Sequence, residues 1–389
     1  MQIEDSLITQ YVLQKHHLLE GSQVESVLQV VNDIIALHAT SVGVPYLSLF
    51  ARVRNFQGNQ LDEEFYLERN LVRLELMRGT LFVVSTDLAP MIFQATRLSE
   101  SQIRKVVEKW GVYAGEYEKL AEKLYDVLGR DGKTIHEIKR DLPKAMVRSV
   151  VLKTRRQVYR STNVGIVLQA LTRLGVVISE KDPGALSIIK GNRFSLLKEK
   201  YPYLNLNSIT KEDARVTLVR SYIKAFGPVA ETDIVWWTGF SMTEVKQALA
   251  KIEEEILSVK IRGFKRNYLM LKEDYEAFSY FRPLTKPSIA LLPYEDPYTK
   301  GYKIRDRLID SSLEKRVYVG GGVQPTILLD GKIIGIWNRS IEEGKGPIKL
   351  KFFSRVSEEV EREFVEKAKA IGKLMSTYDV NVEIFYEKL

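Results

Sequence analysis

The pattern of apolar and polar residues changes from a helical period to a strand-like period within the first 90 positions. Leu28, Val31 and Ile35 keep roughly the spacing of one face of an amphipathic helix. Gly79 can adopt the positive φ that a tight turn between two strands requires. Helical stretches cover residues 7–19, 24–37 and 45–54, and strand-like stretches cover 71–77 and 80–85. This part of the chain therefore predicts helices followed by a β-hairpin.

The same order of patterns returns between residues 115 and 195. Thr134 and Glu137 form a capping box that begins a helix, Pro143 ends that helix, and Gly175 ends the next one. Helices are expected over 116–128, 135–142 and 164–174, and strands over 176–180 and 186–189.

A third copy, similar in pattern only, occupies about 208–275. Helices are expected over 210–225, 231–238 and 242–255, and strands over 256–261 and 268–272. The turn between these two strands, 262–267, is basic. Helices followed by a hairpin are typical of winged helices, in which a helix or the wing docks on DNA.

Residues 276–389 differ because short strand patterns dominate them. Strands are expected over 289–292, 316–319, 326–329, 332–337, 348–353 and 380–386. Asp330-Gly331 is a strong hairpin-turn signal, and Ser357 caps a predicted helix over 357–376. We expect an α+β fold of tandem winged-helix (helix-turn-helix plus β-hairpin) repeats with a C-terminal β-rich, barrel-like domain. The expected division is 1–110, 111–205 and 206–280 for three winged helices, and 281–389 for the β-rich domain.

The amino-acid composition excludes several kinds of site. The 389 residues include no cysteine and only four histidines, which excludes disulfides and thiolate ligands; we expect no metal site and no cofactor. No apolar run is long enough to span a membrane, and the first residues lack the pattern of a signal peptide. A cytoplasmic monomer is the expectation.

The net charge of +8 is unevenly distributed. Residues 133–160 hold nine basic residues against Glu137 and Asp141 only. Such a patch attracts polyanions by releasing their counterions, although a solvated helical face would have the same composition. The residues expected to contact DNA, mainly its phosphates, are Arg78, Lys153, Arg155, Arg156, Arg160, Arg262, Lys265 and Arg266.

A polar pair interrupts the apolar stretch 35–52. His38 and Thr40 lie two residues apart, where one predicted helix ends and the next begins. A buried polar pair costs free energy unless it has partners. The pair therefore either caps the helix end locally or faces a pocket.

Four segments in register resemble the AlkZ/YcaQ family of winged-helix DNA glycosylases. They are 73–84, with its Arg-Gly-Thr-Leu run, 222–239, 291–298 and 325–337. The resemblance covers nearly the whole chain. It implies tandem winged helices, a barrel-like C-terminal part, and excision of alkylated or crosslinked bases from DNA. The family's catalytic pair, Gln-x-Gln or Gln-x-Asp, falls on His38-Ala39-Thr40, so both catalytic residue types differ here.

The resemblance implies that His38 and Thr40 position and partly activate the water that attacks the N-glycosidic bond. A histidine of ordinary pKa can accept a proton from water at neutral pH. Asp296, in the third segment, could face the cationic sugar of the transition state. The expected substrate is double-stranded DNA with alkylated or deaminated bases, met in the cytoplasm at the nucleoid.

Other interpretations remain open at this point. His38 and Thr40 could cap a helix in a non-catalytic winged-helix protein that only binds or regulates DNA, and Asp296 could cap a turn. A lysine Schiff-base lyase is not excluded. An RNA-binding factor is a weaker alternative, because no aromatic RNA-binding strand motif occurs.

Overall fold

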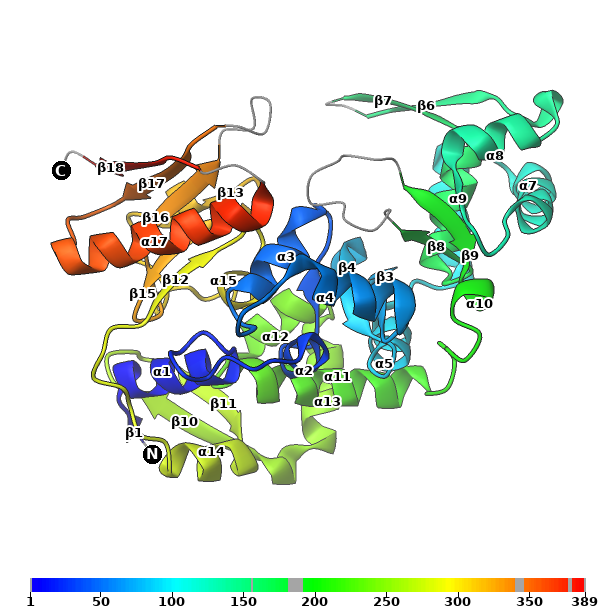
Figure 1. Cartoon of the computed structure of the whole chain (residues 1–389). Coiled ribbons are helices and arrows are strands. Elements are labelled where there is room, and N and C mark those ends of the chain that lie inside the picture. Colours follow the sequence, from blue (N-terminus) through cyan, green and yellow to red (C-terminus); the bar gives the residue numbers. More distant parts are fainter. Residues whose placement is uncertain (1, 155–156, 181–191, 340–345, 377–379, 388–389) are drawn as a thin grey trace.

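The computed structural model describes residues 2–154, 157–180, 192–339, 346–376 and 380–387 of the chain (Figure 1). It has an α+β fold. The helices are α1 (Asp5–Lys15), α2 (Val27–Asp33), α3 (Gly43–Phe50), α4 (Gly58–Asp62), α5 (Ala89–Thr96), α6 (Glu100–Lys109), α7 (Ala114–Val127), α8 (Ile135–Asp141), α9 (Asn163–Arg173), α10 (Leu197–Lys200), α11 (Lys211–Phe226), α12 (Glu231–Thr238), α13 (Met242–Lys251), α14 (Lys272–Ser279), α15 (Pro297–Lys300), α16 (Glu314–Val317) and α17 (Glu358–Met375). The strands are β1 (Gln2–Ile3), β2 (Leu37–His38), β3 (Leu71–Glu75), β4 (Leu81–Ser85), β5 (Lys133–Thr134), β6 (Ser149–Lys153), β7 (Val158–Thr162), β8 (Val177–Glu180), β9 (Arg193–Leu196), β10 (Ile256–Ile261), β11 (Asn267–Leu271), β12 (Ile289–Leu292), β13 (Tyr318–Val319), β14 (Gly322–Val323), β15 (Thr326–Leu329), β16 (Lys332–Arg339), β17 (Ile348–Phe352) and β18 (Val382–Tyr386).

The first hairpin is the one that the alternation predicts. β3 and β4 pair antiparallel, and the turn between them places Arg78 at φ 54° and Gly79 at φ 69°. The preceding helix is shorter than predicted, because α2 ends at Asp33. Ile35 then adopts φ 71°, which breaks the helix, and the chain continues as β2 alongside β4. His38 therefore lies in a strand, and the expectation that it sits at a helix end is wrong.

The second part of the chain contains α7, α8 and α9 as predicted. The capping box forms: Thr134 Oγ1 accepts from the backbone N–H of Glu137, and the Glu137 carboxylate accepts from the Thr134 N–H. β8 pairs with β9, while the strand predicted over 186–189 lies outside the described residues. The hairpin β6–β7 was not predicted; it projects from the end of the molecule that holds α7, α8 and α9 (Figure 1).

The third copy has the predicted order of α11, α12 and α13 followed by the β10–β11 hairpin. The N-terminal strand β1 adds to this hairpin in parallel with β10. This pairing ties the N-terminal residues of the chain to the third copy, more than 250 positions away in the sequence.

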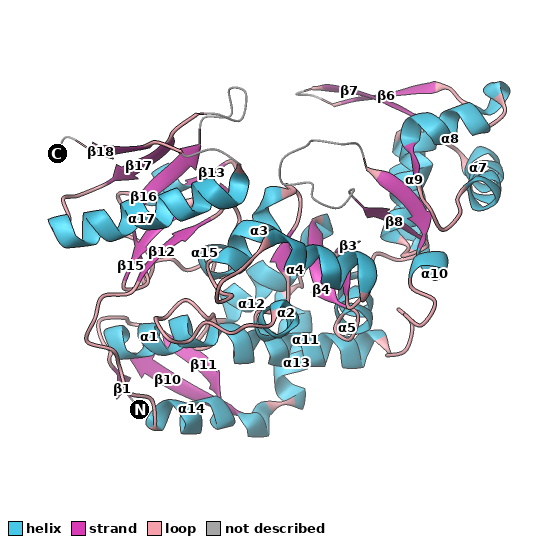
Figure 2. Cartoon of the chain, viewed as in Figure 1, coloured by secondary structure: helices cyan, strands magenta, loops and turns pink. Residues whose placement is uncertain are grey.

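The C-terminal strands form one sheet in the order β12-β15-β16-β17-β18. Helix α17 runs across this sheet (Figure 2) and buries Phe364 and Ala368 against it. Within the described ranges the sheet stays open, with β12 and β18 as its edges, so the barrel-like expectation is corrected to an open sheet.

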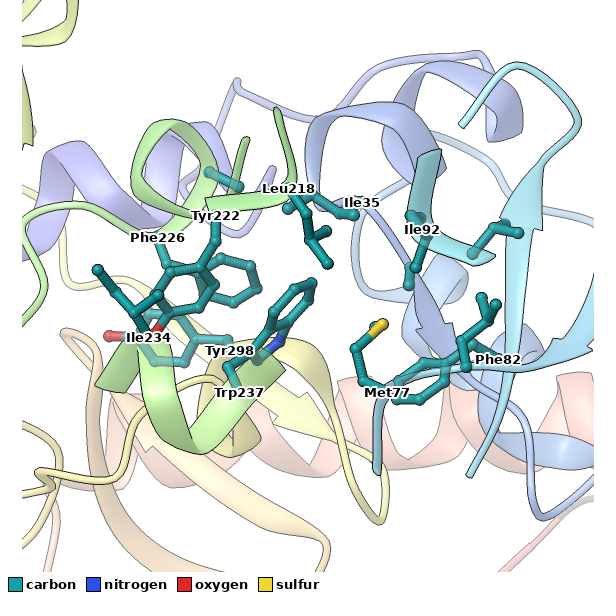
Figure 3. Packing of buried hydrophobic residues seen from close by; sticks show 14 of the residues in the cluster. Ile35, Met77, Phe82, Ile92, Leu218, Tyr222, Phe226, Ile234, Trp237 and Tyr298 are labelled. Carbon is teal, nitrogen blue, oxygen red and sulfur yellow. The ribbon is translucent and has the colours of Figure 1, made fainter. Parts of the chain in front are cut away.

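One large apolar cluster joins distant segments of the chain. It takes Val12 from α1, Val84 from the first hairpin, Tyr222 from α11 and Ile333 from the C-terminal sheet. Figure 3 shows part of it, including Trp237. A second cluster, from Ile103 to Val177, is formed by the region of α6 to α9 and β8. The short strand β2 lies on the sheet that contributes to the large cluster, so the turn after it is held by a rigid part of the molecule.

Candidate functional site

Strand pairing and packing fix the position of His38. Its register partner is Phe82 in β4, and the imidazole makes an edge-on contact with the Phe82 ring at 5.2 Å between centroids. His38 is only 5% exposed. Thr40, two residues later, is exposed. The turn therefore presents the threonine to solvent and keeps the histidine behind it.

Both ring nitrogens of His38 have a neighbour. The hydroxyl of Thr40 lies 2.8 Å from Nδ1, and Oε2 of Glu295 lies 3.5 Å from Nε2. The three side chains form a row from solvent into the protein. The row resembles the arrangement in which a carboxylate orients an imidazole that in turn contacts a hydroxyl. The polar pair seen in the sequence thus has partners on both sides.

Glu295 was not predicted as a site residue. It adopts φ 56°, and its backbone N–H donates to the carbonyl of Val323 in β14. Its carboxylate also binds the ammonium group of Lys300, 2.9 Å away. In the sequence, Glu295 could have been noticed because it lies beside Asp296 in a segment that resembles the family. Only the fold shows that Glu295, and not Asp296, faces His38.

Burial dominates the electrostatics of the site. It lowers the pKa of His38 to about 4; the Glu295 carboxylate acts against this shift, and Lys300 and Arg78 add to it. Burial also lowers the pKa of Lys300, against the effect of Glu295. His38 is therefore neutral near pH 7, since its pKa lies well below that value.

Asp296 has the environment of a capping carboxylate, one of the two interpretations left open by the sequence. Its side chain is fully buried and receives two hydrogen bonds from the guanidinium of Arg52, which is itself fully buried. It also accepts from Ser48 Oγ and from the backbone N–H of Tyr298, where it caps α15. This carboxylate holds α15 against α3, next to the segment that carries Glu295.

The guanidinium of Arg73 fixes the residue between the two candidate catalytic side chains. Its Nε and Nη2 donate to the carbonyl of Ala39 at 3.2 and 3.0 Å. Its Nη1 donates to the carbonyl of Ser179 in β8 at 3.0 Å. Arg73 is 9% exposed, so these bonds lie in a buried environment where they are strong.

The candidate DNA-binding residues lie in three places. Arg78 is exposed near His38, Lys153 and Arg160 are exposed on the β6–β7 hairpin, and Lys265 is exposed in the turn between β10 and β11. In that turn, Arg262 pairs with Glu4, and Arg266 pairs with Asp306. Arg155 and Arg156 lie outside the described residues. The structure thus brings Arg78 to the His38 site and places the other residues on separate hairpins.

Other types of site find little support within the described ranges. No group of three His, Asp or Glu side chains is arranged to hold a metal ion there, and none of the described helices is long and apolar enough to cross a membrane. A cleft of about 850 Å³ is lined by residues of α1, α11 and α14, among others, and neither His38 nor Thr40 lines it.

Comparisons with known proteins agree with the segments noted above. A family model described as DNA glycosylase AlkZ-like matches residues 31–374. Over 131 residues the chain is 23% identical to an interstrand DNA cross-link repair glycosylase of Streptomyces sahachiroi; this stretch is 32% of the chain and about a third (34%) of that relative. The structure of the Streptomyces sahachiroi DNA glycosylase AlkZ matches with a TM-score of 0.73 at 18% identity, over 99% of this chain and 100% of that one. At this identity the structural match shows a shared fold.

Proposed function

The chain belongs to the AlkZ-like DNA glycosylase family, and on that premise we propose that it excises alkylated or deaminated bases from double-stranded DNA. The observation that carries the proposal is the row of Thr40, His38 and Glu295. His38 and Thr40 stand at the two positions on which the family's catalytic pair falls, and Glu295 adds a carboxylate from another segment. In this proposal the protein is a monofunctional hydrolase without a cofactor.

We propose that Thr40 contacts the attacking water. The N-glycosidic bond breaks first, and its electron pair leaves with the base, so the sugar becomes an oxocarbenium-like cation. The water oxygen then bonds to C1′ of the sugar. As that bond forms the water becomes acidic, and its proton passes to the Thr40 oxygen while the Thr40 proton passes to Nδ1 of His38. The tautomer required carries its hydrogen on Nε2, facing the Glu295 carboxylate.

The low pKa of His38 sets the limits of this role. A pKa of about 4 makes the imidazole a weak base, so it contributes mainly by orienting Thr40 and the water. Glu295 stabilises the positive charge that develops on His38 and on the sugar. This assistance acts on the water and on the sugar, so it suits cationic alkylpurines, which leave as neutral bases; a neutral lesion such as hypoxanthine leaves as an anion that takes its proton from solvent.

We also propose how the parts of the molecule act on DNA. The three groups of helices and hairpins act as winged helices, with divisions near residues 110, 205 and 280. Lys153, Arg160 and Lys265 contact phosphates from their hairpins. The protein works as a monomer on DNA at the cytoplasmic nucleoid. By analogy with the Streptomyces protein named for crosslink repair, interstrand crosslinks are candidate substrates.

A base-release assay tests the proposal. Duplexes with N7-methylguanine, N3-methyladenine, hypoxanthine or uracil are incubated with the wild type and with His38→Ala, Thr40→Ala and Glu295→Gln. We expect release of at least one base by the wild type and a loss of about 100-fold or more in His38→Ala, because Thr40 and the water then lose the side chain that orients them, and misplaced reacting groups lower rates on that scale. His136→Ala, which alters an exposed histidine on α8, is the matched control.

The outcomes separate the two main interpretations. Wild-type rates in His38→Ala would refute the assignment of the catalytic residue. An absence of release from every duplex and from crosslinked DNA, together with tight and sequence-dependent binding, would favour a non-catalytic regulator.

A further inference from the structure

Four basic side chains surround one indole beside the candidate site. The guanidinium of Arg78 lies 4.4 Å from the ring centre of Trp236 in α12. Lys300, Lys303 and Arg305 lie 5.5, 5.2 and 5.6 Å from the same point. Each contact is a cation–π interaction, and together they concentrate positive charge in a small volume. Two members of the group, Arg78 and Lys300, are close enough to His38 to lower its pKa.

The two exposed members of this group have no anionic partner among the described residues. Lys300 is buried and paired with Glu295, and the largely buried Arg305 pairs with Glu314 at 2.8 Å. Arg78 and Lys303 are exposed, and no carboxylate of the described residues lies within ion-pair distance of either. Like charges held close together repel one another, so this arrangement is stabilised when an anion binds.

Arg78 is positioned by packing. It lies in the tight turn between β3 and β4 at φ 54°, and its stem runs against Gly239 at the end of α12. A Cβ atom at Gly239 would come within 3.0 Å of Cγ of Arg78. The close approach places the guanidinium on the indole before any ligand arrives, so little side-chain entropy is lost on binding.

The ligand that fits is a phosphodiester of the DNA backbone. A guanidinium fork and an ammonium group next to each other bind phosphate oxygens well. The alternative, a nucleobase stacked on Trp236, is disfavoured because Arg78 occupies the approach to the ring at 4.4 Å. We propose that Arg78 and Lys303, set on Trp236 and backed by Arg305, clamp one phosphate adjacent to the nucleotide that is presented to His38. The location of this phosphate rests on the proposed glycosylase function.

Chemical neutralisation of single phosphates tests the proposal. A duplex with a tetrahydrofuran abasic analogue is made with one neutral methylphosphonate at each of the nearest positions on either side of the analogue. Binding is measured for the wild type, for the double variant Arg78→Ala with Lys303→Ala, and for Lys369→Ala with Lys373→Ala. The last pair removes the same charge from the exposed face of α17.

We expect one position at which the methylphosphonate weakens wild-type binding about tenfold, the scale of a charge-assisted hydrogen bond, and has no effect on the Arg78 and Lys303 variant. The α17 variant should behave as the wild type does. If every position weakens both proteins equally, or none weakens the wild type, the subsite is refuted.

The result is independent of catalysis because the analogue has no base to release. Coupling at one phosphate without base release from any lesion would support the subsite and refute the glycosylase. Thermal unfolding of the double variant shows whether it is folded, and Lys303→Ala alone, at an exposed position, gives a second measure of the same coupling.

Discussion

The protein lowers the pKa of His38 relative to that of a histidine in water. Its ring is buried against Phe82, and the cationic groups of Lys300 and Arg78 oppose its protonation. The unfolded chain has no such restriction, so its histidine titrates near 6.5. Between these two pKa values the unfolded state binds a proton that the folded state does not bind.

This difference predicts a pH-dependent stability. The free energy of unfolding should fall as the pH drops from about 6.5 toward 4, because the pKa of His38 in the folded protein is about 4. Between pH 7 and pH 5 the contribution is about 2 kcal/mol, from 1.36 kcal/mol per pKa unit. Chemical denaturation of the wild type and of His38→Gln at both pH values measures it.

The glutamine variant is the useful comparison because it keeps a neutral hydrogen-bonding side chain and removes the titration. His16, which is fully buried and also has a lowered pKa, contributes equally to both proteins and cancels. An equal loss of stability in both proteins between pH 7 and pH 5 would contradict the environment described for His38.

At the scale of elements, the site depends on three short strands and one arginine. β2 carries His38, β4 pairs with it, and Arg73 in β3 holds the Ala39 carbonyl and reaches across to β8. Burying a guanidinium group costs free energy of desolvation. Hydrogen bonds offset this cost best where the rigid fork of the group matches two acceptors. Here these acceptors belong to the candidate catalytic turn and to the neighbouring sheet.

Arg73→Lys should therefore lower the rate of base release about tenfold or more while duplex affinity stays within about twofold, because a lysine keeps the charge but cannot hold Ala39 at two points. Single-turnover kinetics and binding to undamaged duplex measure the two effects. Arg69→Lys is the matched control, since Arg69 reaches Glu180 of the same strand β8. Equal effects of the two substitutions on the rate would show that Arg73 acts only through the contact between the sheets.

The sequence was informative where a single period ran through a whole element. The 3.6-residue spacing over α9 and the alternation over β3 and β4 predict the observed elements. β2 could not be predicted, because two residues are too short to show a period and a β-branched residue such as Ile35 rarely adopts the positive φ that it has here. His38 became a candidate catalytic residue through the family resemblance, whereas its neighbour Glu295 depends on how the segment before α15 meets β14.

At the scale of the whole molecule, basic side chains occur on hairpins that lie apart. The β6–β7 hairpin projects from one end (Figure 1) and exposes Lys153, Arg160 and Tyr159. β10–β11 lies in a different sheet with β1. Such separate arms can contact several phosphates of one duplex and so orient it without reading its sequence.

The β6–β7 hairpin should thus contribute to DNA affinity and have little effect on the rate of base release. Lys153→Ala with Arg160→Ala should lower the slope of log Kd against log salt concentration by about 2, close to 0.9 for each phosphate that the protein no longer neutralises. Base release at saturating protein should stay unchanged. Fluorescence anisotropy with undamaged duplex from 50 to about 200 mM salt measures the slope. A slope equal to that of the wild type would indicate that these side chains do not contact phosphates.

The large apolar cluster determines the order in which parts of the protein can fold during synthesis on the ribosome. It combines Val12 of α1 with Phe353, which follows β17, and β1 pairs with β10, whose residues lie more than 250 positions further along the chain. The cluster of Ile103 to Val177 needs only local chain and can collapse as soon as it has emerged. Helix α1 can complete its packing only after the chain up to Phe353 has been synthesised, so the surroundings of His38, which include Glu295, are completed long after β2 itself has been made.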